Sequence, residues 1–232
     1  MSKGVKAGGF SEAVGTLIAK LCYRAADDLG EELAAYTGKL RQRNALKILE
    51  EAAEKHALLE DYENRTASPR LAYHIIDEGS WTEDDRIHSF WAGLLASSCT
   101  EDGGDEGNLI FVNTLKQLTS LEARILEYAC EQSQKTVTSV GWVMANPLTI
   151  RLEDLIALTG ESDIHRLDRE MDHLRSLELL ATGGFSPGST SADITPSAFA
   201  LHMYTRCQGY VGSPVDFFGL ELNAEDSELE DT

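Results

Sequence analysis

The chain of 232 residues contains no run of eighteen consecutive apolar side chains, so the sequence encodes no conventional membrane-spanning helix. Its four cysteines lie far apart, without the paired spacing of a zinc site or a disulfide framework, and no apolar secretory leader precedes them. We therefore expect reduced, buried thiols in a cytoplasmic protein. We find neither a nucleophile elbow between a strand and a helix nor a phosphate-binding glycine loop, which argues against the enzyme classes that use them.

Charge of one sign is also scarce. Lys and Arg number 20 against 39 Asp and Glu, which gives a formal net charge of −19 at pH 7. Only residues 1–50 carry more basic than acidic side chains. An acidic body repels nucleic acid phosphates and anionic lipid headgroups, so only the front of the chain suits either partner electrostatically. We expect residues 209–232 to form an acidic tail that is largely disordered at its end.

Apolar residues are abundant. They make up 42% of the chain and can supply a core. Within residues 1–40 the apolar side chains recur every three or four positions, which predicts an amphipathic helix with cationic flanks. Its apolar face would be core for the next helix, an interface with a second copy of the chain, or a surface that lies on a membrane. The residues of this predicted oligomer or membrane face are Phe10, Val14, Leu17, Ile18, Lys20, Leu21 and Arg24.

Helix start and stop signals continue along the chain. Ser68 before Pro69 predicts a helix start and Gly79 its end, while Thr119 with Glu122 three residues later forms a capping box. Gly160 predicts the end of the helix "RLEDLIALTG". These signals predict a mainly α-helical protein.

Two further helix starts lie between those signals. Thr82 with Asp85 predicts a helix that ends at Cys99, and Asn108 is placed to cap a short helix after a glycine-rich acidic loop. We expect a helical domain over residues 41–118.

From residue 119 to 208 the predicted order is helix, short strand, helix, longer helix, β-hairpin and helix. That order is typical of a winged helix-turn-helix domain, with an irregular loop and one short strand in residues 136–150. The longer helix, residues 162–177, would supply the contact surface, formed by His165, Arg166, Arg169 and Arg175. Acids outnumber these arginines and no Lys or Arg lies between Ser176 and Thr205, so double-stranded DNA is an unlikely partner and a protein contact is favoured.

The same helix contains the best candidate metal ligands. His165, Asp168 and Asp172 share one side of it, with His173 one residue further on. Arginines intervene to pair with these acids, and such spacing is common on polar helices. We therefore expect solvated ion pairs here and no metal, and we expect no cofactor elsewhere.

The stretch "IHSFWAGLLASSC", residues 87–99, presents one broad apolar stripe on a helix. Catalysis needs convergent polar groups, and this face contains none. The pattern predicts core packing around a signature of Phe90, Trp91, Leu94 and Leu95.

This signature also resembles the central motif of the Abi-alpha family of bacterial abortive infection proteins, which shows Trp-Ala-x-Leu-Leu-Ala and then Leu-x-x-Leu-(Ser or Thr). Trp91, Ala92 and Leu94–Ala96 match the first part, and "LKQLT", residues 115–119, matches the second. Gly93 stands where the family usually has asparagine, so a polar role at that position does not carry over. The resemblance implies a role in anti-phage defence but brings no catalytic residues with it.

Together these observations predict a non-enzymatic effector or regulatory component of an abortive infection system. We expect it to self-associate through its helical half, in the cytoplasm or at the periphery of the inner membrane. A partner protein or a nucleotide-type signal from a neighbouring gene would activate it, and its N-terminal helix would then act on the membrane. The alternative is a winged-helix transcriptional regulator or adaptor that acts by protein contact. A nuclease that holds a metal on the acids of residues 163–172 ranks third.

Overall fold

The computed structural model describes residues 15–21, 38–59, 61–186 and 188–221. The described chain is mainly helical with a few short antiparallel strands. It divides into two compact units. Unit 1 contains the described residues up to Gln117 together with Arg206–Val211, and unit 2 contains Leu118–Thr205 together with the described residues from Gly212. The acidic end predicted as a tail lies, from residue 222 on, outside the described residues.

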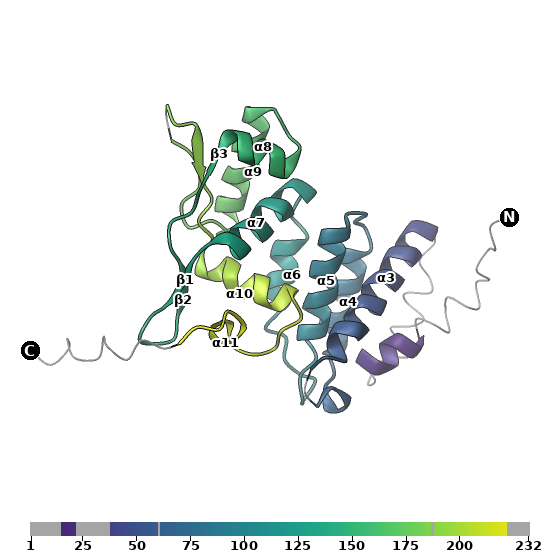
Figure 1. Cartoon of the computed structure of the whole chain (residues 1–232). Helices are drawn as coiled ribbons and strands as arrows, with labels where there is room; N and C mark the ends of the chain where they lie inside the picture. The colour runs from purple at the N-terminus through teal and green to yellow at the C-terminus, as the bar shows by residue number, and fades with distance from the viewer. Residues whose placement is uncertain (1–14, 22–37, 60, 187, 222–232) are drawn as a thin grey trace, which may run out of the picture. The chain divides into compact units, whose positions relative to one another are not determined.

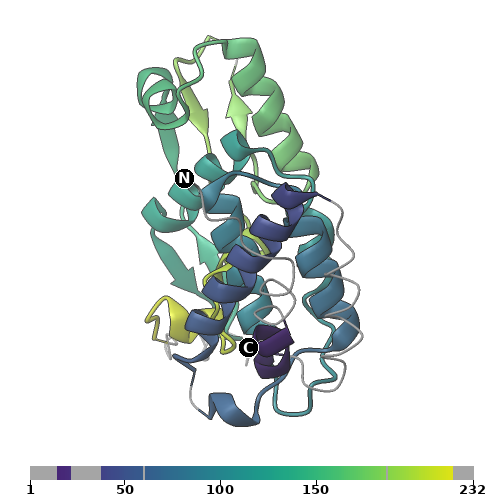
Figure 2. The same cartoon turned by 90° about the vertical axis from the view of Figure 1, so that its right-hand side faces the viewer.

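Unit 1 is a group of α-helices. A helical stretch over residues 15–21 is followed by α3 (Lys39–His56), the 3-10 helix η2 (Tyr62–Asn64), α4 (Pro69–Gly79), α5 (Asp85–Ser97) and α6 (Leu109–Leu115). Helices α3, α4 and α5 pack against one another and α6 contacts α4, as Figures 1 and 2 show. Helix α5 is buried on nearly all sides, so it forms the centre of this core.

The helix starts predicted in unit 1 are partly confirmed. Pro69 is the first residue of α4 after the N-cap Ser68, as expected. Helix α5 begins at Asp85, but its N-cap is Asp84, whose carboxylate accepts from the backbone N–H groups of Arg86 and Ile87. The Thr82 hydroxyl instead accepts from the backbone N–H of Asp84.

Asn108 lies at the N-cap of α6, but it does not cap the helix with its side chain. Its amide donates instead to the hydroxyls of Ser97 and Ser98, at 3.2 and 2.9 Å. The Asn108 amide therefore bonds buried hydroxyl groups at the end of α5, and it does not cap α6 as the local spacing predicts.

Unit 2 combines helices with two small antiparallel sheets. Its elements are α7 (Ser120–Gln132), β1 (Lys135–Val137), β2 (Val143–Ala145), β3 (Thr149–Arg151), α8 (Leu152–Thr159), α9 (Ile164–Ser176), β4 (Gly184–Phe185), β5 (Ser191–Asp193), α10 (Ala198–Cys207) and α11 (Pro214–Phe217), with the end of α10 from Arg206 in unit 1. Strands β1 and β2 form a hairpin, and the second sheet has the order β3-β5-β4. Helices α8 and α9 both contact α7.

Residues 136–150 contain more strand than the single short one predicted. They include most of β1 and all of β2, and β3 begins at Thr149. The β1–β2 turn is closed where the backbone N–H of Thr138 donates to the carbonyl of Trp142, and Gly141 takes a positive φ of 84° in that turn. In the sequence this turn is marked by a single glycine. That signal is too weak to distinguish a hairpin from a loop.

Local helix signals in unit 2 are confirmed. Thr119 and Glu122 form the capping box at the start of α7, each side chain accepting from the other residue's backbone N–H. Gly160 ends α8 in the left-handed region, with φ 73°, which a residue without a Cβ adopts without strain. No helix among the described residues is long and apolar enough to cross a membrane.

Gly93 allows a very close backbone contact inside unit 1. A Cβ atom added to Gly93 would lie 1.7 Å from the carbonyl oxygen of Cys207 and 3.0 Å from the backbone nitrogen of Gly209. The segment Arg206–Val211 therefore lies directly on α5 at this position. Glycine is required there because any side chain would push the segment away.

We expect Gly93→Ala to lower the free energy of unfolding by about 2 kcal/mol or more, because the added methyl group overpacks a backbone contact. The measurement is urea denaturation followed by far-UV circular dichroism. Gly104→Ala is the matched control. Its new Cβ would meet no atom closer than 3.7 Å, so its effect should stay below about 0.5 kcal/mol. Equal stability of the two variants would contradict the packing of Arg206–Val211 on α5.

Candidate functional site

The predicted N-terminal face is docked on unit 1 as far as it is described. Ile18 and Leu21 are each 1% exposed, Leu17 is half-buried and Lys20 is exposed. Phe10, Val14 and Arg24, which belong to the same predicted face, lie outside the described residues. The described part of the stripe is therefore core of unit 1 in this structure.

The carbonyl of Leu21 anchors the end of the 15–21 helix. It accepts from the backbone N–H of Ala67 at 2.7 Å and from the hydroxyl of Thr66 at 3.1 Å. The thiol of Cys99 contacts the same oxygen at 3.8 Å. Thr66 is itself held by two backbone hydrogen bonds to Thr100, each 2.9 Å. A carbonyl at a helix end has no partner within its own helix, so these contacts replace the missing bond.

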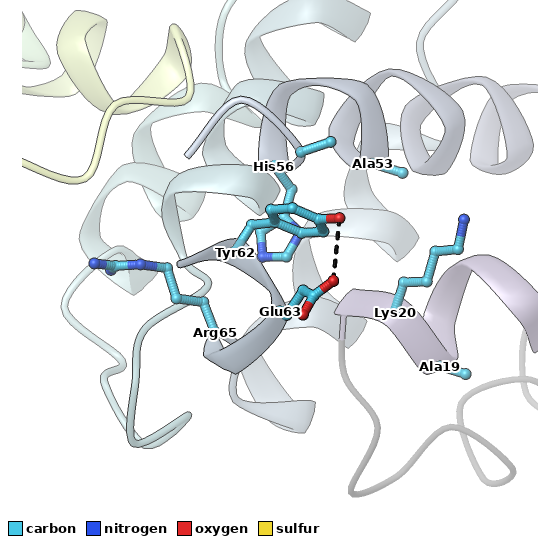
Figure 3. Close-up of a pocket in the computed structure, with 8 residues that line it drawn as sticks. Ala19, Lys20, Ala53, His56, Tyr62, Glu63 and Arg65 are labelled. Carbon is cyan, nitrogen blue, oxygen red and sulfur yellow. Dashed lines mark hydrogen bonds between the residues drawn. The ribbon is translucent and has the colours of Figure 1, made fainter. Parts of the chain in front are cut away.

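A cavity of about 480 Å³ opens where this helix meets α3 and η2 (Figure 3), and we call it the His56 cavity. Its volume lies within the range of small-molecule sites, about 300–1,000 Å³. The lining residues are Ala19, Lys20, Ala53, His56, Ala57, Tyr62, Glu63 and Arg65. They come from three separate elements, and no local pattern in the sequence groups them.

His56 is the most unusual group of this cavity. It is 4% exposed, and its Nε2 has no hydrogen-bond partner among the described residues. Burial lowers the pKa of His56 below its usual 6.5, although a hydrogen bond to the backbone of Arg65 opposes this. The imidazole is therefore neutral near pH 7, and the ring of Tyr62 stands edge-on to it at 5.9 Å.

Charged groups surround the cavity on different sides. The Arg65 guanidinium pairs with Glu101 at 3.6 Å and extends away from His56 in Figure 3. The hydroxyl of Tyr62 donates to Glu63 across 3.5 Å, at the limit of hydrogen bonding. Lys20 forms no ion pair with another described residue. The cavity thus presents charged and aromatic groups to a ligand, and its described lining contains no Ser, Thr or Cys.

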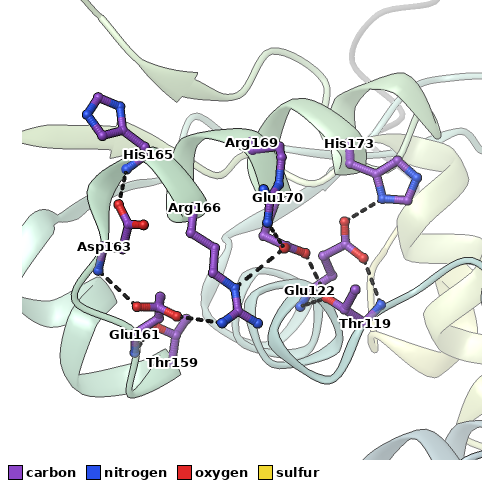
Figure 4. Close-up of polar contacts among 10 residues, drawn as sticks. All are labelled: Thr119, Glu122, Thr159, Glu161, Asp163, His165, Arg166, Arg169, Glu170 and His173. Atoms are coloured by element: carbon purple, nitrogen blue, oxygen red, sulfur yellow. Dashed lines mark hydrogen bonds and ion pairs between the residues drawn. The ribbon is translucent and has the colours of Figure 1, made fainter.

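The predicted contact surface on α9 is exposed, but its arginines are engaged (Figure 4). Each of the three forms an ion pair with a nearby carboxylate. Figure 4 shows the pairs of Arg166 and Arg169, and the His165 ring projects away from them. The pairs are Arg166 with Glu161 at 2.8 Å, Arg169 with Glu170 at 3.3 Å and Arg175 with Asp172 at 2.8 Å. Arginines that neutralise acids of the same helix region have little charge left for phosphates.

Beneath this surface a buried polar network connects α7 to α9. Glu122 is fully buried and accepts from the Thr119 backbone N–H at 2.8 Å, while its other oxygen contacts His173 Nδ1 at 2.5 Å. The Thr119 hydroxyl donates to Glu170 at 2.9 Å. The sequence identified Glu122 only as a capping residue. Its partner His173 lies 51 positions away, and no local signal could have found it.

The described residues offer few groups that are suited to catalysis. They contain no group of three His, Cys, Asp or Glu side chains placed to hold a metal ion. Cys99, Cys130 and Cys207 are buried free thiols, and burial raises the pKa of Cys207 to about 12, which keeps it protonated. Ser186 stands in a G-x-S-x-G pattern, but it follows β4 in a hairpin and no helix supports it.

The signature residues of α5 are buried. Phe90, Trp91, Leu94 and Leu95 are at most 2% exposed. They form part of the core of unit 1 and contribute no polar group to a site.

The fold and these sites define a mainly helical protein whose signature motif is apolar and whose described polar groups are mostly used in internal contacts. Residues 41–194 match the abortive infection alpha family, and the chain belongs to that family. This membership indicates a role of the abortive infection type. Neither the curated proteins nor the solved structures contain a significant match to it.

We expect Glu122→Ala to lower the free energy of unfolding by about 2–3 kcal/mol, because it removes half of the capping box and the buried partner of His173. Urea denaturation of the full chain measures this loss. Asp168→Ala, an exposed acid on α9, is the control and should change stability by less than about 0.5 kcal/mol. A Glu122→Ala protein as stable as the control would show that the network does not hold α7 to α9.

Proposed function

We propose that the protein is a non-enzymatic effector or regulatory component of a bacterial abortive infection system. It acts through its apolar N-terminal face, which is released when a signal or a partner protein activates the protein. Membership of the abortive infection alpha family supports the biological role. The observation that carries the mechanism is the docking of residues 15–21, where the described contacts include the buried side chains of Ile18 and Leu21 and the hydrogen bonds to the Leu21 carbonyl.

The size of those contacts supports a reversible attachment. Burial of Ile18 and Leu21 contributes about 1.5–3 kcal/mol for each side chain, and each hydrogen bond to the Leu21 carbonyl about 0.5–1.5 kcal/mol. The entropy of ordering the segment offsets part of this sum. A ligand or partner that prefers the released state by a few kcal/mol would therefore shift the equilibrium.

The released face has two destinations. Its apolar residues would be buried between copies of the chain, or they would lie in the headgroup region of a membrane with Lys20 toward anionic lipid. Both fit a cytoplasmic protein that becomes peripheral to the inner membrane on activation. Either event gives a growth-arresting response without catalysis.

We expect Leu21→Ala to arrest the growth of a bacterial host in the absence of phage, because it weakens docking and leaves the rest of the face apolar. The double variant Leu17→Asp, Leu21→Asp also undocks, but it destroys the apolar face and should not arrest growth. Growth curves after induction measure both effects, and leakage of phosphatidylethanolamine–phosphatidylglycerol vesicles separates membrane action from self-association.

Leu115→Ala, which removes a buried leucine of α6 far along the chain from the docked helix, controls for general destabilisation of unit 1. If Leu115→Ala arrests growth as strongly as Leu21→Ala, the effect is misfolding. If the doubly charged variant is equally toxic, the apolar face is not the active part.

The alternative is a winged-helix regulator or adaptor, and the topology of unit 2 favours it. Helix α7 precedes β3, α8 and α9, and the hairpin β4–β5 follows with the sheet order β3-β5-β4. This succession of elements supports the alternative, with the β1–β2 hairpin as an insertion. The paired arginines of α9 favour a protein partner over DNA.

Titration of a duplex against the full chain at low and high salt tests this alternative. We expect no salt-sensitive binding at about 50 mM salt, because too few cations are available for phosphates. Binding that weakens with salt and is lost in Arg169→Ala would instead support a transcriptional regulator.

A further inference from the structure

We propose that the His56 cavity binds a small nucleotide, with its base against His56 and Tyr62 and its phosphate on Lys20. The inference goes beyond the proposed function, because the site would exist whether or not the protein acts in phage defence. Figure 3 shows the groups that carry it on three elements of unit 1. Each recognises a different part of such a ligand.

The Nε2 atom of the His56 imidazole is available to accept a hydrogen bond from a ligand. In a neutral imidazole one nitrogen carries the proton and the other accepts. The ring already hydrogen-bonds to the backbone of Arg65, whereas the buried Nε2 has no partner among the described residues. A buried acceptor without a donor is costly, so a ligand with an N–H group gains by supplying one. Nucleobases present such ring and amino N–H groups.

Tyr62 provides the aromatic surface. Its side chain is 41% exposed, and a single 3.5 Å contact to Glu63 holds its hydroxyl. The ring now stands edge-on to His56. A small rotation would expose the imidazole and offer the face of the ring to a flat base, since aromatic rings stack on every base. The Glu63 carboxylate accepts a second donor from the same ligand.

Lys20 supplies the charge for a phosphate. It lines the cavity on the 15–21 helix and is exposed, with no ion pair to another described residue. Ammonium–phosphate hydrogen bonds are stronger than neutral ones. Phosphate alone would use only this cation and would leave the His56 acceptor unmatched, so the cavity favours a ligand that combines an anion with a donor-bearing ring.

Such a ligand would also connect the docked helix to α3. It would touch Lys20 on one element and His56 on the other, and so it would bind the docked state better than the released state. Binding to one state stabilises that state. Occupancy of the His56 cavity should therefore hold residues 15–21 in place.

Isothermal titration of the full chain with AMP, GMP, CMP and UMP tests the proposal, with inorganic phosphate and the four nucleosides as partial probes. We expect at least one mononucleotide to bind with a Kd of about 100 µM or tighter. Phosphate and the matching nucleoside should each bind about tenfold more weakly. No heat of binding from any mononucleotide at about 1 mM would overturn the proposal, and so would phosphate that binds as tightly as the nucleotide.

Three variants locate the bound nucleotide. Lys20→Ala and Tyr62→Ala change exposed side chains, and each should weaken binding about tenfold. His56→Asn keeps a nitrogen donor for the Arg65 backbone and removes Nε2, so it should cause a similar loss. Lys39→Ala, an exposed lysine at the start of α3, is the matched control and should bind as the wild type does. Binding that none of the first three variants weakens would place the nucleotide elsewhere and overturn the assignment.

The failure of this test and the failure of the proposed function are distinguishable. Titration reports the cavity alone, while the growth assay reports the apolar face. A chain that binds no nucleotide but arrests growth through Leu21→Ala would disprove only the inference about the His56 cavity.

Discussion

From Phe90 onward helix α5 has almost no polar surface, and unit 1 is organised around the need to bury it. Its signature side chains are at most 2% exposed, so neighbouring elements must cover this part of the helix. Helices α3 and α4 cover part of it, and the segment Arg206–Val211 returns from far along the chain to cover Gly93. The family motif on α5 therefore forms part of the core of unit 1.

Polar residues in this protein mainly connect elements to one another. Glu122 joins α7 to α9 through His173, and Thr66 with Ala67 holds the carbonyl of Leu21. The chain as a whole is strongly acidic, and the arginines of α9 pair with acids close to them. The groups whose bonding is incomplete are few among the described residues, and His56 is one that borders a cavity. Both proposals therefore start from binding and release.

The docked helix and the His56 cavity are neighbours, which joins the two proposals physically. Residues 15–21 contribute both the buried pair Ile18 and Leu21 and the cavity residues Ala19 and Lys20. Opposite faces of the same helix thus meet the core and the cavity. A small molecule that contacts this helix would change the balance between its docked and released states without any rearrangement of the α3–α5 core.

The sequence by itself determined the local features of the protein: its helical class, the start of α4 at Pro69, the capping box at Thr119 and the end of α8 at Gly160. These follow from interactions that span at most four or five positions, so neighbouring residues specify them. It also carried the family motif on α5. Only the tertiary structure decided that Asp84 rather than Thr82 caps α5, that Asn108 serves the end of α5, and that residues 136–150 hold a hairpin. It also decided which groups meet at the His56 cavity and which buried partner Glu122 has. Asn108 lies 10 and 11 positions from its serine partners, and Glu122 lies 51 positions from His173. At each of these places several arrangements satisfy the same local pattern until packing selects one.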